Sequence, residues 1–159
     1  MSSSAFADTA GTQTFTATVT ANTCTVDNLN KTVDLGSVLS SDFTSAFSAM
    51  VSNRFIDTGF QITGCPAAIT AVKVTSTFAS TSGYGFVDNN GTFDAVFATN
   101  ITAANTIDNS QKWTPGSEKT FTVTNGDASV PVQGKIFAQK SDLTAGTLNY
   151  AMSFTFDFA

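Results

Sequence analysis

Eleven residues near the end of the chain read Leu148-Asn149-Tyr150-Ala151-Met152-Ser153-Phe154-Thr155-Phe156-Asp157-Phe158. Every second residue, from Leu148 to Phe158, is apolar, and the residues between them are small or polar. Successive side chains of a β-strand point to opposite faces, so this period of two predicts a strand with one buried face. Burying one such side chain stabilises a fold by roughly 1.5–3 kcal/mol, so the strand needs an apolar partner surface along its length. Periodicity alone also allows an ordinary core strand that happens to come last.

A second alternating segment, Thr14–Thr20, lies near the other end of the chain, where Phe15, Ala17 and Val19 alternate with threonine. This pattern predicts either an early core strand or a detachable one. A detachable strand could fill the sheet edge of another molecule by β-strand addition. Periodicity does not distinguish these two interpretations.

Shorter alternating segments between these two predict further strands, bounded by glycine, proline and Asn-Gly pairs. Asn90-Gly91 and Asn125-Gly126 predict hairpin turns. Only Asp42–Val51 could carry a helical turn, and no segment has the period of a long amphipathic helix. One domain is expected from the length, and it is predicted to be an all-β sandwich or barrel. The predicted strands include residues 32–35, 60–63, 72–78, 121–124 and 130–138.

The composition excludes several classes of protein. Charged residues make up only 12% of the 159 residues, about half the usual share, and 27 threonines and 17 serines supply the polar surface instead. The absence of histidine removes His-based triads and His metal sites, and two cysteines cannot form a four-ligand zinc site. A net charge of −5 without a basic cluster makes nucleic acid an unexpected partner. We therefore predict no enzyme activity, no metal and no cofactor.

The start of the chain suggests export. Ala5-Phe6-Ala7 has the small-x-small form of a secretory cleavage site, so residues 1–7 are interpreted as the remnant of a leader; the alternative is merely a flexible start. Cys24 and Cys65 are an even pair without a CxxC motif, consistent with one disulfide in an oxidising compartment. A bridge between them would close a loop of about 42 residues and contribute up to ~4 kcal/mol in the chain-entropy model. Two buried free thiols are the alternative.

Taken in order, these segments resemble the pilin subunits of chaperone–usher fimbriae, of the type 1 and P pilus kind. Phe15-x-Ala17-x-Val19 followed by Cys24 is similar to the opening motif of that family. Gly146 lies fourteenth from the end and Phe158 is penultimate, and with the alternating apolar residues between them they resemble the C-terminal signature of the family. Three internal segments also resemble family strands: 32–38, Phe60-x-Ile62-x-x-Cys65, and 132–138.

The resemblance implies an incomplete immunoglobulin-like sandwich that lacks its last strand and is completed by a donor strand from another subunit. Residues 8–21 would be the N-terminal donor-strand extension, and residues 22–159 the pilin domain. The implied donor residues are Gln13, Phe15, Ala17 and Val19. The implied acceptor groove, where a periplasmic chaperone would also bind, consists of Gly146, Leu148, Tyr150, Met152, Phe154, Phe156, Phe158 and Ala159, with the terminal carboxylate as the chaperone anchor.

Two positions of the extension depart from the family pattern. Ala17 stands where glycine is usual, and an extra methyl group in a tight site typically costs ~1–3 kcal/mol. Gln13 stands where a bulkier apolar residue is common. Both positions bear on the strength of the donor strand and leave the acceptor strand unaffected.

The function implied by the resemblance is a structural subunit that polymerises by donor-strand exchange into fibres used in cell adhesion. Its partners would be neighbouring pilin subunits, with a homopolymer expected, a periplasmic chaperone and an outer-membrane usher. The location would be an extracellular fimbrium on a Gram-negative bacterium. The alternative is a single-domain adhesive pilin that binds a host glycan or protein receptor, with Trp113 or Tyr84 stacking on a sugar; a simpler interpretation of Trp113 is one anchored aromatic in a loop. Asp88-Asn89-Asn90-Gly91 resembles a calcium loop only faintly, and a turn is preferred.

Overall fold

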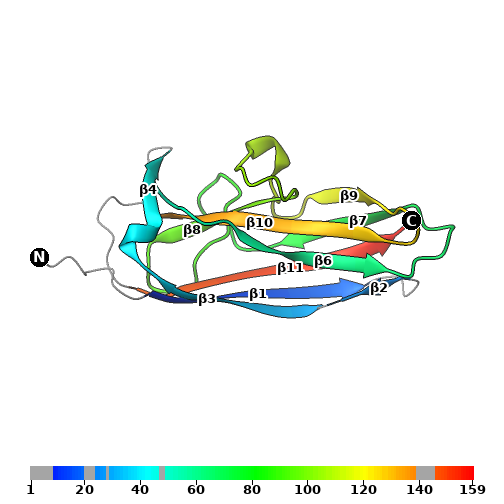
Figure 1. Ribbon diagram of the computed structural model, residues 1–159, viewed down its shortest axis with the longest axis horizontal. Coiled ribbons are helices and arrows are strands. Elements are labelled where there is room, and N and C mark those ends of the chain that lie inside the picture. Colours follow the sequence, from blue (N-terminus) through cyan, green and yellow to red (C-terminus); the bar gives the residue numbers. More distant parts are fainter. Residues whose placement is uncertain (1–8, 20–23, 28, 47–48, 139–145) are drawn as a thin grey trace, which may run out of the picture.

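The computed structural model describes residues 9–19, 24–27, 29–46, 49–138 and 146–159, and these form two facing β-sheets (Figure 1). Within these ranges the helical segments are two 3-10 turns, Ser40–Asp42 and Asn109–Gln111. No helix in the described ranges is long and apolar enough to cross a membrane. The prediction of an all-β sandwich is confirmed.

The first sheet contains the two strands with the most regular alternation, and it has the order β3-β1-β11-β7-β9. The second sheet has the order β2-β6-β10-β5-β4, and β8 also pairs with β10, along Gln133 to Ala138. The strands of the first sheet are β1 (Thr9–Val19), β3 (Asn30–Val38), β7 (Ala71–Thr77), β9 (Glu118–Thr122) and β11 (Leu148–Phe158). Those of the second are β2 (Thr25–Val26), β4 (Phe43–Ala46), β5 (Ala49–Ser52), β6 (Ile56–Thr63), β8 (Ala95–Asn100) and β10 (Ala128–Ala138).

The core lies between the two sheets and is rich in aromatic side chains. The ring of Phe60 on β6 meets the rings of Phe154 and Phe156 on β11 edge-on, with both centroid distances 5.1 Å. Trp113 has no exposed surface, and its ring packs edge-on against Phe154 at 5.3 Å. Since edge-to-face pairs at these distances are favourable beyond the area they bury, β11 is held to the opposite sheet along much of its length.

Of the two predicted hairpin turns, the structure confirms the one at Asn125-Gly126 and contradicts the one at Asn90-Gly91. Asn125 and Gly126 both have positive φ, 53° and 84°, as a type I′ turn requires, so that prediction is confirmed. Asn90-Gly91 is no tight hairpin turn, because the nearest antiparallel bridge joins Val87 to Phe97 and residues 88–94 form a longer loop. Asp42–Val51, the segment that could carry a helical turn, contains instead β4 and β5, which pair antiparallel, and β5 gains a second partner in β10.

Cys24 and Cys65 form a disulfide, so the alternative of two free thiols is wrong. The bond joins the residue before β2 to the segment just after β6, and β2 and β6 are themselves paired at Thr25–Thr63 and Val26–Ile62. It therefore fixes the point from which the chain enters the sandwich after β1.

Reduction of this disulfide should destabilise the protein by about 2–4 kcal/mol, because the unfolded chain regains the entropy of the closed loop. For a chain of this size the melting temperature should fall by roughly 5–15 °C. Calorimetry with and without a reductant tests this, and a Cys24→Ala/Cys65→Ala variant should reproduce the shift without reductant. An unchanged melting temperature in both would contradict a stabilising role for the bond.

Candidate functional site

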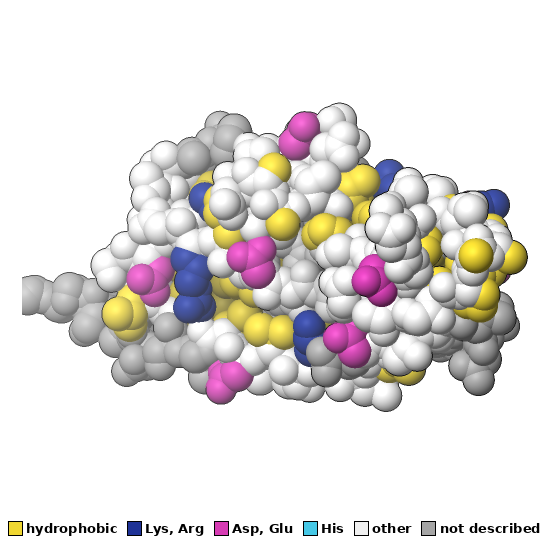
Figure 2. Space-filling model, turned by 45° about the vertical axis from the view of Figure 1, so that its right-hand side comes forward, with side chains coloured by type: hydrophobic (Ala, Val, Ile, Leu, Met, Phe, Trp, Pro, Cys, Tyr) yellow, Lys and Arg dark blue, Asp and Glu magenta, His cyan; other side chains and the backbone are white. Residues whose placement is uncertain are grey.

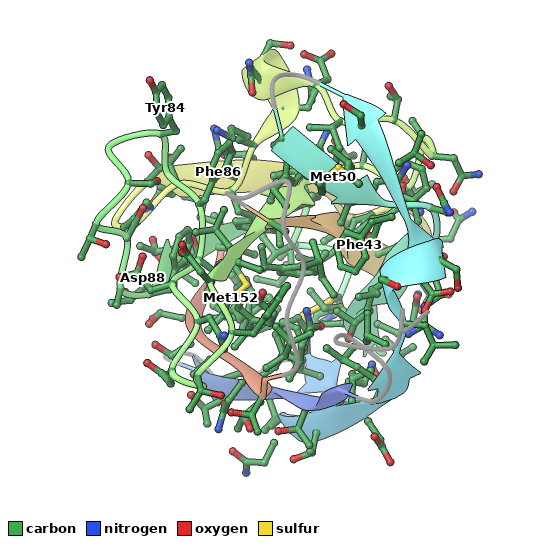
Figure 3. All side chains as sticks on the ribbon, turned by 90° about the vertical axis from the view of Figure 1, so that its left-hand side faces the viewer. Phe43, Met50, Tyr84, Phe86, Asp88 and Met152 are labelled. Carbon is green, nitrogen blue, oxygen red and sulfur yellow. A yellow bond between two sulfur atoms is a disulfide. The ribbon has the colours of Figure 1, made fainter. Side chains whose placement is uncertain are left out.

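The candidate site is the groove along β11, and the structure places the predicted acceptor side chains on its buried face. Their exposed fractions lie between 0% and 7%. The alternate residues of β11 are exposed or half-buried, so the strand has one buried face and one solvent-facing face. The buried residues are Leu148, Tyr150, Met152, Phe154, Phe156 and Phe158. Figure 3 shows Met152 in the interior, between the sheets.

The groove is occupied by β1 of the same chain. β1 lies between β3 and β11, and it runs parallel to β11 in one continuous register from Gly11–Leu148 to Val19–Phe156. On its other side it pairs antiparallel with β3, with a register shift between Gly11 and Thr12. The predicted donor segment and the predicted acceptor strand are therefore neighbours in a single chain, whereas the sequence analysis placed the donor segment in a neighbouring subunit.

Two of the predicted donor side chains contribute apolar contacts to the groove. Phe15 is 2% exposed, and its ring stacks on Phe154 at a centroid distance of 6.2 Å. Ala17 is half-buried and packs against the main core, so its methyl group has room in this groove. The backbone of Val19 pairs with Phe156 at the end of the register. The opposite face of β1 carries Thr12 and Thr16, both exposed.

Gly11 marks a place where β1, β3 and β11 approach closely. A Cβ atom at Gly11 would lie 3.1 Å from Leu148 Cβ and 3.1 Å from Leu35 Cδ1. Few Cβ contacts in proteins are this short, so a larger residue at position 11 would push Leu148 or Leu35 aside. Glycine therefore lets the first part of β1 lie directly over the start of β11.

Gln13 occupies the same inward face as Phe15 but is polar. Its side chain is completely buried, and neither Nε2 nor Oε1 has a hydrogen-bond partner among the described residues. In the ladder it lies opposite Tyr150 on β11 and Val33 on β3. The Tyr150 hydroxyl donates to the carbonyl of Ala95 at 3.0 Å, and burial raises the pKa of this phenol.

The start of β11 is fixed by the loop of residues 88–94. Asn89 Nδ2 donates to the carbonyls of Phe93 and Thr147 at 2.6 and 2.9 Å, and its Oδ1 accepts from the amides of Gly91 and Asn149 at 2.9 and 2.7 Å. The amide of Asn90 donates to the carbonyl of Asn149 at 2.8 Å. β7 pairs with β11 only from Ser153 onward, so this loop supplies the partner that the first part of β11 otherwise lacks on that side.

Gly146 and Gly91 allow this loop to lie against the chain just before β11. A Cβ atom at Gly146 would lie 2.8 Å from Phe93 Cβ, and one at Gly91 would lie 2.2 Å from the Thr147 carbonyl oxygen. Neither distance occurs in relaxed structures. Gly146, which belongs to the C-terminal signature that the sequence resembles, is therefore needed in this fold because a side chain there would collide with Phe93.

The last predicted site residue, Ala159, is tied to the start of β7. Its oxygen accepts from the amides of Thr70 and Ala71 at 2.9 and 3.1 Å, and its amide donates to the Ala71 carbonyl at 3.0 Å. The end of β11 therefore extends the ladder with β7 by one residue beyond Phe158.

The groove is suited to binding a β-strand, since it offers a ladder edge and apolar contacts. No group of three or more His, Cys, Asp or Glu residues that could hold a metal ion occurs in the part of the chain that the structure describes. Figure 2 shows charged side chains of both signs spread over the face it displays, some of them side by side, without a large patch of either sign.

The two aromatic residues considered for sugar stacking lie in different environments. Trp113 is fully buried, its Nε1 donates to the Pro131 carbonyl at 3.0 Å, and its ring stacks on Phe121. The simpler interpretation of Trp113 as an anchored aromatic is confirmed. Tyr84 is 71% exposed and projects away from the molecule (Figure 3). A single exposed ring does not make a sugar site.

The residues that support the groove from outside β1 and β11 were not predicted from the sequence. Asn89 and Phe93 belong to this set, as does Leu35, which contacts the position of Gly11. The available signal was Asn89-x-Gly91, because an Asn side chain often accepts a hydrogen bond from the amide two residues later. Nothing in the sequence pattern pointed to contacts of this loop with residues 147–149.

No protein-family model matches the chain. In sequence it is similar to Protein FimG of Escherichia coli (strain K12), with 29% identity over 144 residues that cover 89% of this chain and 80% of FimG. In structure it is similar to the P pilus rod subunit PapA, with a TM-score of 0.64 and 16% identity, covering 87% of this chain and 100% of the PapA chain.

Two further solved structures have the same fold. One is a chain of a chaperone–usher pilus whose structure explains rod uncoiling, with a TM-score of 0.65 and 16% identity over 89% of this chain and 91% of that one. The other is an antigen and type I fimbria protein of Burkholderia pseudomallei, with a TM-score of 0.53 and 17% identity over 96% of this chain and 99% of that one. The immunoglobulin-like sandwich predicted from the sequence is thereby confirmed.

Replacing Asn89 by aspartate should destabilise the protein at neutral pH by about 1–3 kcal/mol. The variant keeps the acceptor for Gly91 and Asn149 but turns a carboxylate oxygen toward the carbonyls of Phe93 and Thr147. Those carbonyls favour the protonated carboxyl and hold its folded-state pKa above the unfolded value. The deficit should therefore shrink as the pH is lowered from about 7 to about 4.

Urea unfolding at both pH values measures this effect. Asn90→Asp is the matched control, because the side chain of Asn90 is exposed, and it should stay within about 0.5 kcal/mol of the unmodified chain. Equal losses in the two variants, or a deficit for Asn89→Asp that grows at low pH, would contradict the hydrogen bonds assigned to Asn89.

Proposed function

Because this chain belongs to the pilin family of chaperone–usher fimbriae, we propose that it polymerises by donor-strand exchange. Residues 8–21 leave the groove of their own domain and enter the groove along β11 of another copy. The result is a surface fibre in which each domain, residues 22–159, is completed by the extension of its neighbour. The observation that carries this proposal is the occupation of that groove by β1.

The topology supports exchange because β1 can leave without breaking another strand pairing. Among the described residues, β1 pairs only with β3 and β11, and it precedes the other strands of that part of the chain. β11 keeps its ladder with β7, and β6 keeps its ladders with β2 and β10. A strand at one end of the chain is also the easiest to replace by an identical strand from a second copy.

The energetics require that the groove be filled by one strand or another. Without β1 the inward faces of Leu148, Tyr150, Met152 and Phe154 would lose a neighbour, and both β3 and β11 would present unpaired backbone groups. Such an edge is prone to aggregation. A replacing strand restores ladder hydrogen bonds of about 0.5–1.5 kcal/mol each and the apolar contacts of a residue such as Phe15. The empty groove is therefore costly, and exchange proceeds from one filled state to another.

The partners follow from the same requirement. Before assembly the groove can be filled by β1 of the same chain or by a strand of a second protein, and we assign the second role to a periplasmic chaperone. An outer-membrane usher would bring successive subunits together, and the fibre would lie on the surface of a Gram-negative cell. The outward threonines of β1 suit a strand that is exposed to solvent after it leaves its own groove and before it enters another, since they are polar without carrying charge.

Replacing Phe15 by aspartate should abolish polymerisation, because a carboxylate would have to be buried against the apolar face of β11 in the other copy. Thr16→Asp, one position along on the exposed face, is the matched control and should still polymerise. The measurement is the ladder of unboiled assemblies on gels, with electron microscopy of fibres from cells that express the chaperone and usher. Fibres formed equally by the unmodified chain and by Phe15→Asp would contradict the proposal, as would loss of fibres in both variants.

A further inference from the structure

Gln13 is the one inward-facing donor position that carries a polar side chain, and it is buried without compensation. Its exposed fraction is 0%, and both polar atoms of its amide lack a hydrogen-bond partner among the residues that the structure describes. A buried amide with no partner is unfavourable, because it gives up its hydrogen bonds to water and gains none in return. The fit of β1 to its own groove is therefore imperfect at this position.

The neighbours of Gln13 explain why its amide has no partner. Across the ladder it faces Tyr150 on one side and Val33 on the other. The hydroxyl of Tyr150 points away to the Ala95 carbonyl on β8, and Val33 is apolar. Along β1 the next residues on the same face are Gly11 and Phe15, which offer no polar side chain.

The connection between β1 and the rest of the domain holds Gln13 in this environment. Only residues 20–23 separate Val19 from Cys24, and Cys24 is bonded to Cys65 beside the end of β6. Figure 1 shows β1 ending next to β2. Reversing an 11-residue strand would carry Val19 to the far end of the groove, about 33 Å away. Five residue steps reach at most ~18 Å, so the tethered strand can only run parallel to β11.

We propose that Gln13 is a specificity-determining residue that keeps the extension releasable from its own groove. It weakens the closed chain, in which it lies opposite Tyr150 in a strand that the tether keeps parallel to β11, more than it weakens a joint between two chains. A strand that arrives from another copy is free of this tether, so it can enter in another direction or register, and its Gln13 need not face Tyr150. This inference rests on the proposed function, because it assumes that the extension is exchanged between chains.

The first test compares Gln13→Met with Thr16→Val in the full chain. Methionine has a similar length and needs no hydrogen bond, whereas Thr16 lies on the exposed face and serves as the control. Gln13→Met should raise the melting temperature by roughly 2–10 °C. It should also slow the entry of a fluorescent peptide of residues 9–21 by roughly tenfold or more. Thr16→Val should change the entry rate less than about twofold.

The second test puts the same substitution in the peptide and leaves the chain unmodified. If the unfavourable burial belongs to the closed chain, the Gln13→Met peptide should leave the unmodified chain at nearly the same rate as the normal peptide, within about twofold. The inference would be overturned if the Gln13→Met peptide left the unmodified chain about tenfold more slowly than the normal peptide, matching the slower entry into the Gln13→Met chain. Gln13 would then fit any groove poorly. A lower melting temperature of the Gln13→Met chain would overturn it too, because the buried amide would then be stabilising.

The outcome for the unmodified chain separates this inference from the proposed function. If the normal peptide never enters the unmodified or the Thr16→Val chain, exchange does not occur, and the proposed function and the release role fall together. The weakening of the closed chain by Gln13 is decided independently, by the melting temperatures. If the peptide enters readily and Gln13→Met changes neither property, the inference fails while the proposed function stands.

Discussion

The structure depends on a strand that fills the groove along β11, between β3 and β11. The inward face of β11 carries six large apolar side chains, and its first half lacks a β7 partner. β1 completes the first sheet by pairing with both neighbours, and the loop at Asn89 supports β11 from its other side. The aromatic contacts of Phe154 and Phe156 with Phe60 then join this sheet to the second. Without a strand in the groove, the core would be open along one edge of the sandwich. The function therefore depends on which strand fills the groove.

The tether makes the chain's own extension a constrained occupant. The short segment between Val19 and Cys24, together with the disulfide to Cys65, limits β1 to the direction parallel to β11. Parallel pairing is slightly less stable per residue than antiparallel pairing, and Gln13 adds a buried amide without a partner. In the closed chain the groove is thus filled, but the strand that fills it carries one unfavourable residue, Gln13. A subunit that must keep its extension available benefits from a closed state that is stable enough to protect the core and weak enough to be replaced.

The sequence predicted the strands well where the apolar period was strict. The six alternating apolar residues of β11 and the inward Phe15 were placed correctly because only one face of such a strand can be buried. The hairpin of β4 and β5 was missed because its pairing with β10 depends on residues far along the chain. The contacts of Asn89 and Phe93 were missed for the same reason, since they join segments more than 50 residues apart. The seating of β1 in its own groove could not be read from the period, because the same alternation suits the groove of another copy. Gln13 was recognised as a departure from the family pattern, but its unpaired amide is visible only once Tyr150 and Val33 are in place.

The most direct test of the account is an NMR measurement of contacts between the side chain of Phe15 and the inward side chains of β11, which include Phe154 in the closed chain. These rings lie 6.2 Å apart in the closed chain. In the monomer, the contact should occur within one molecule. In fibres assembled from an equal mixture of two differently isotope-labelled preparations, the account predicts that Phe15 of one label contacts the inward side chains of β11 of the other, at a position that the direction and register of entry decide. Contacts confined to single molecules in the fibre would contradict it, because the fibre would then consist of closed units joined through other surfaces.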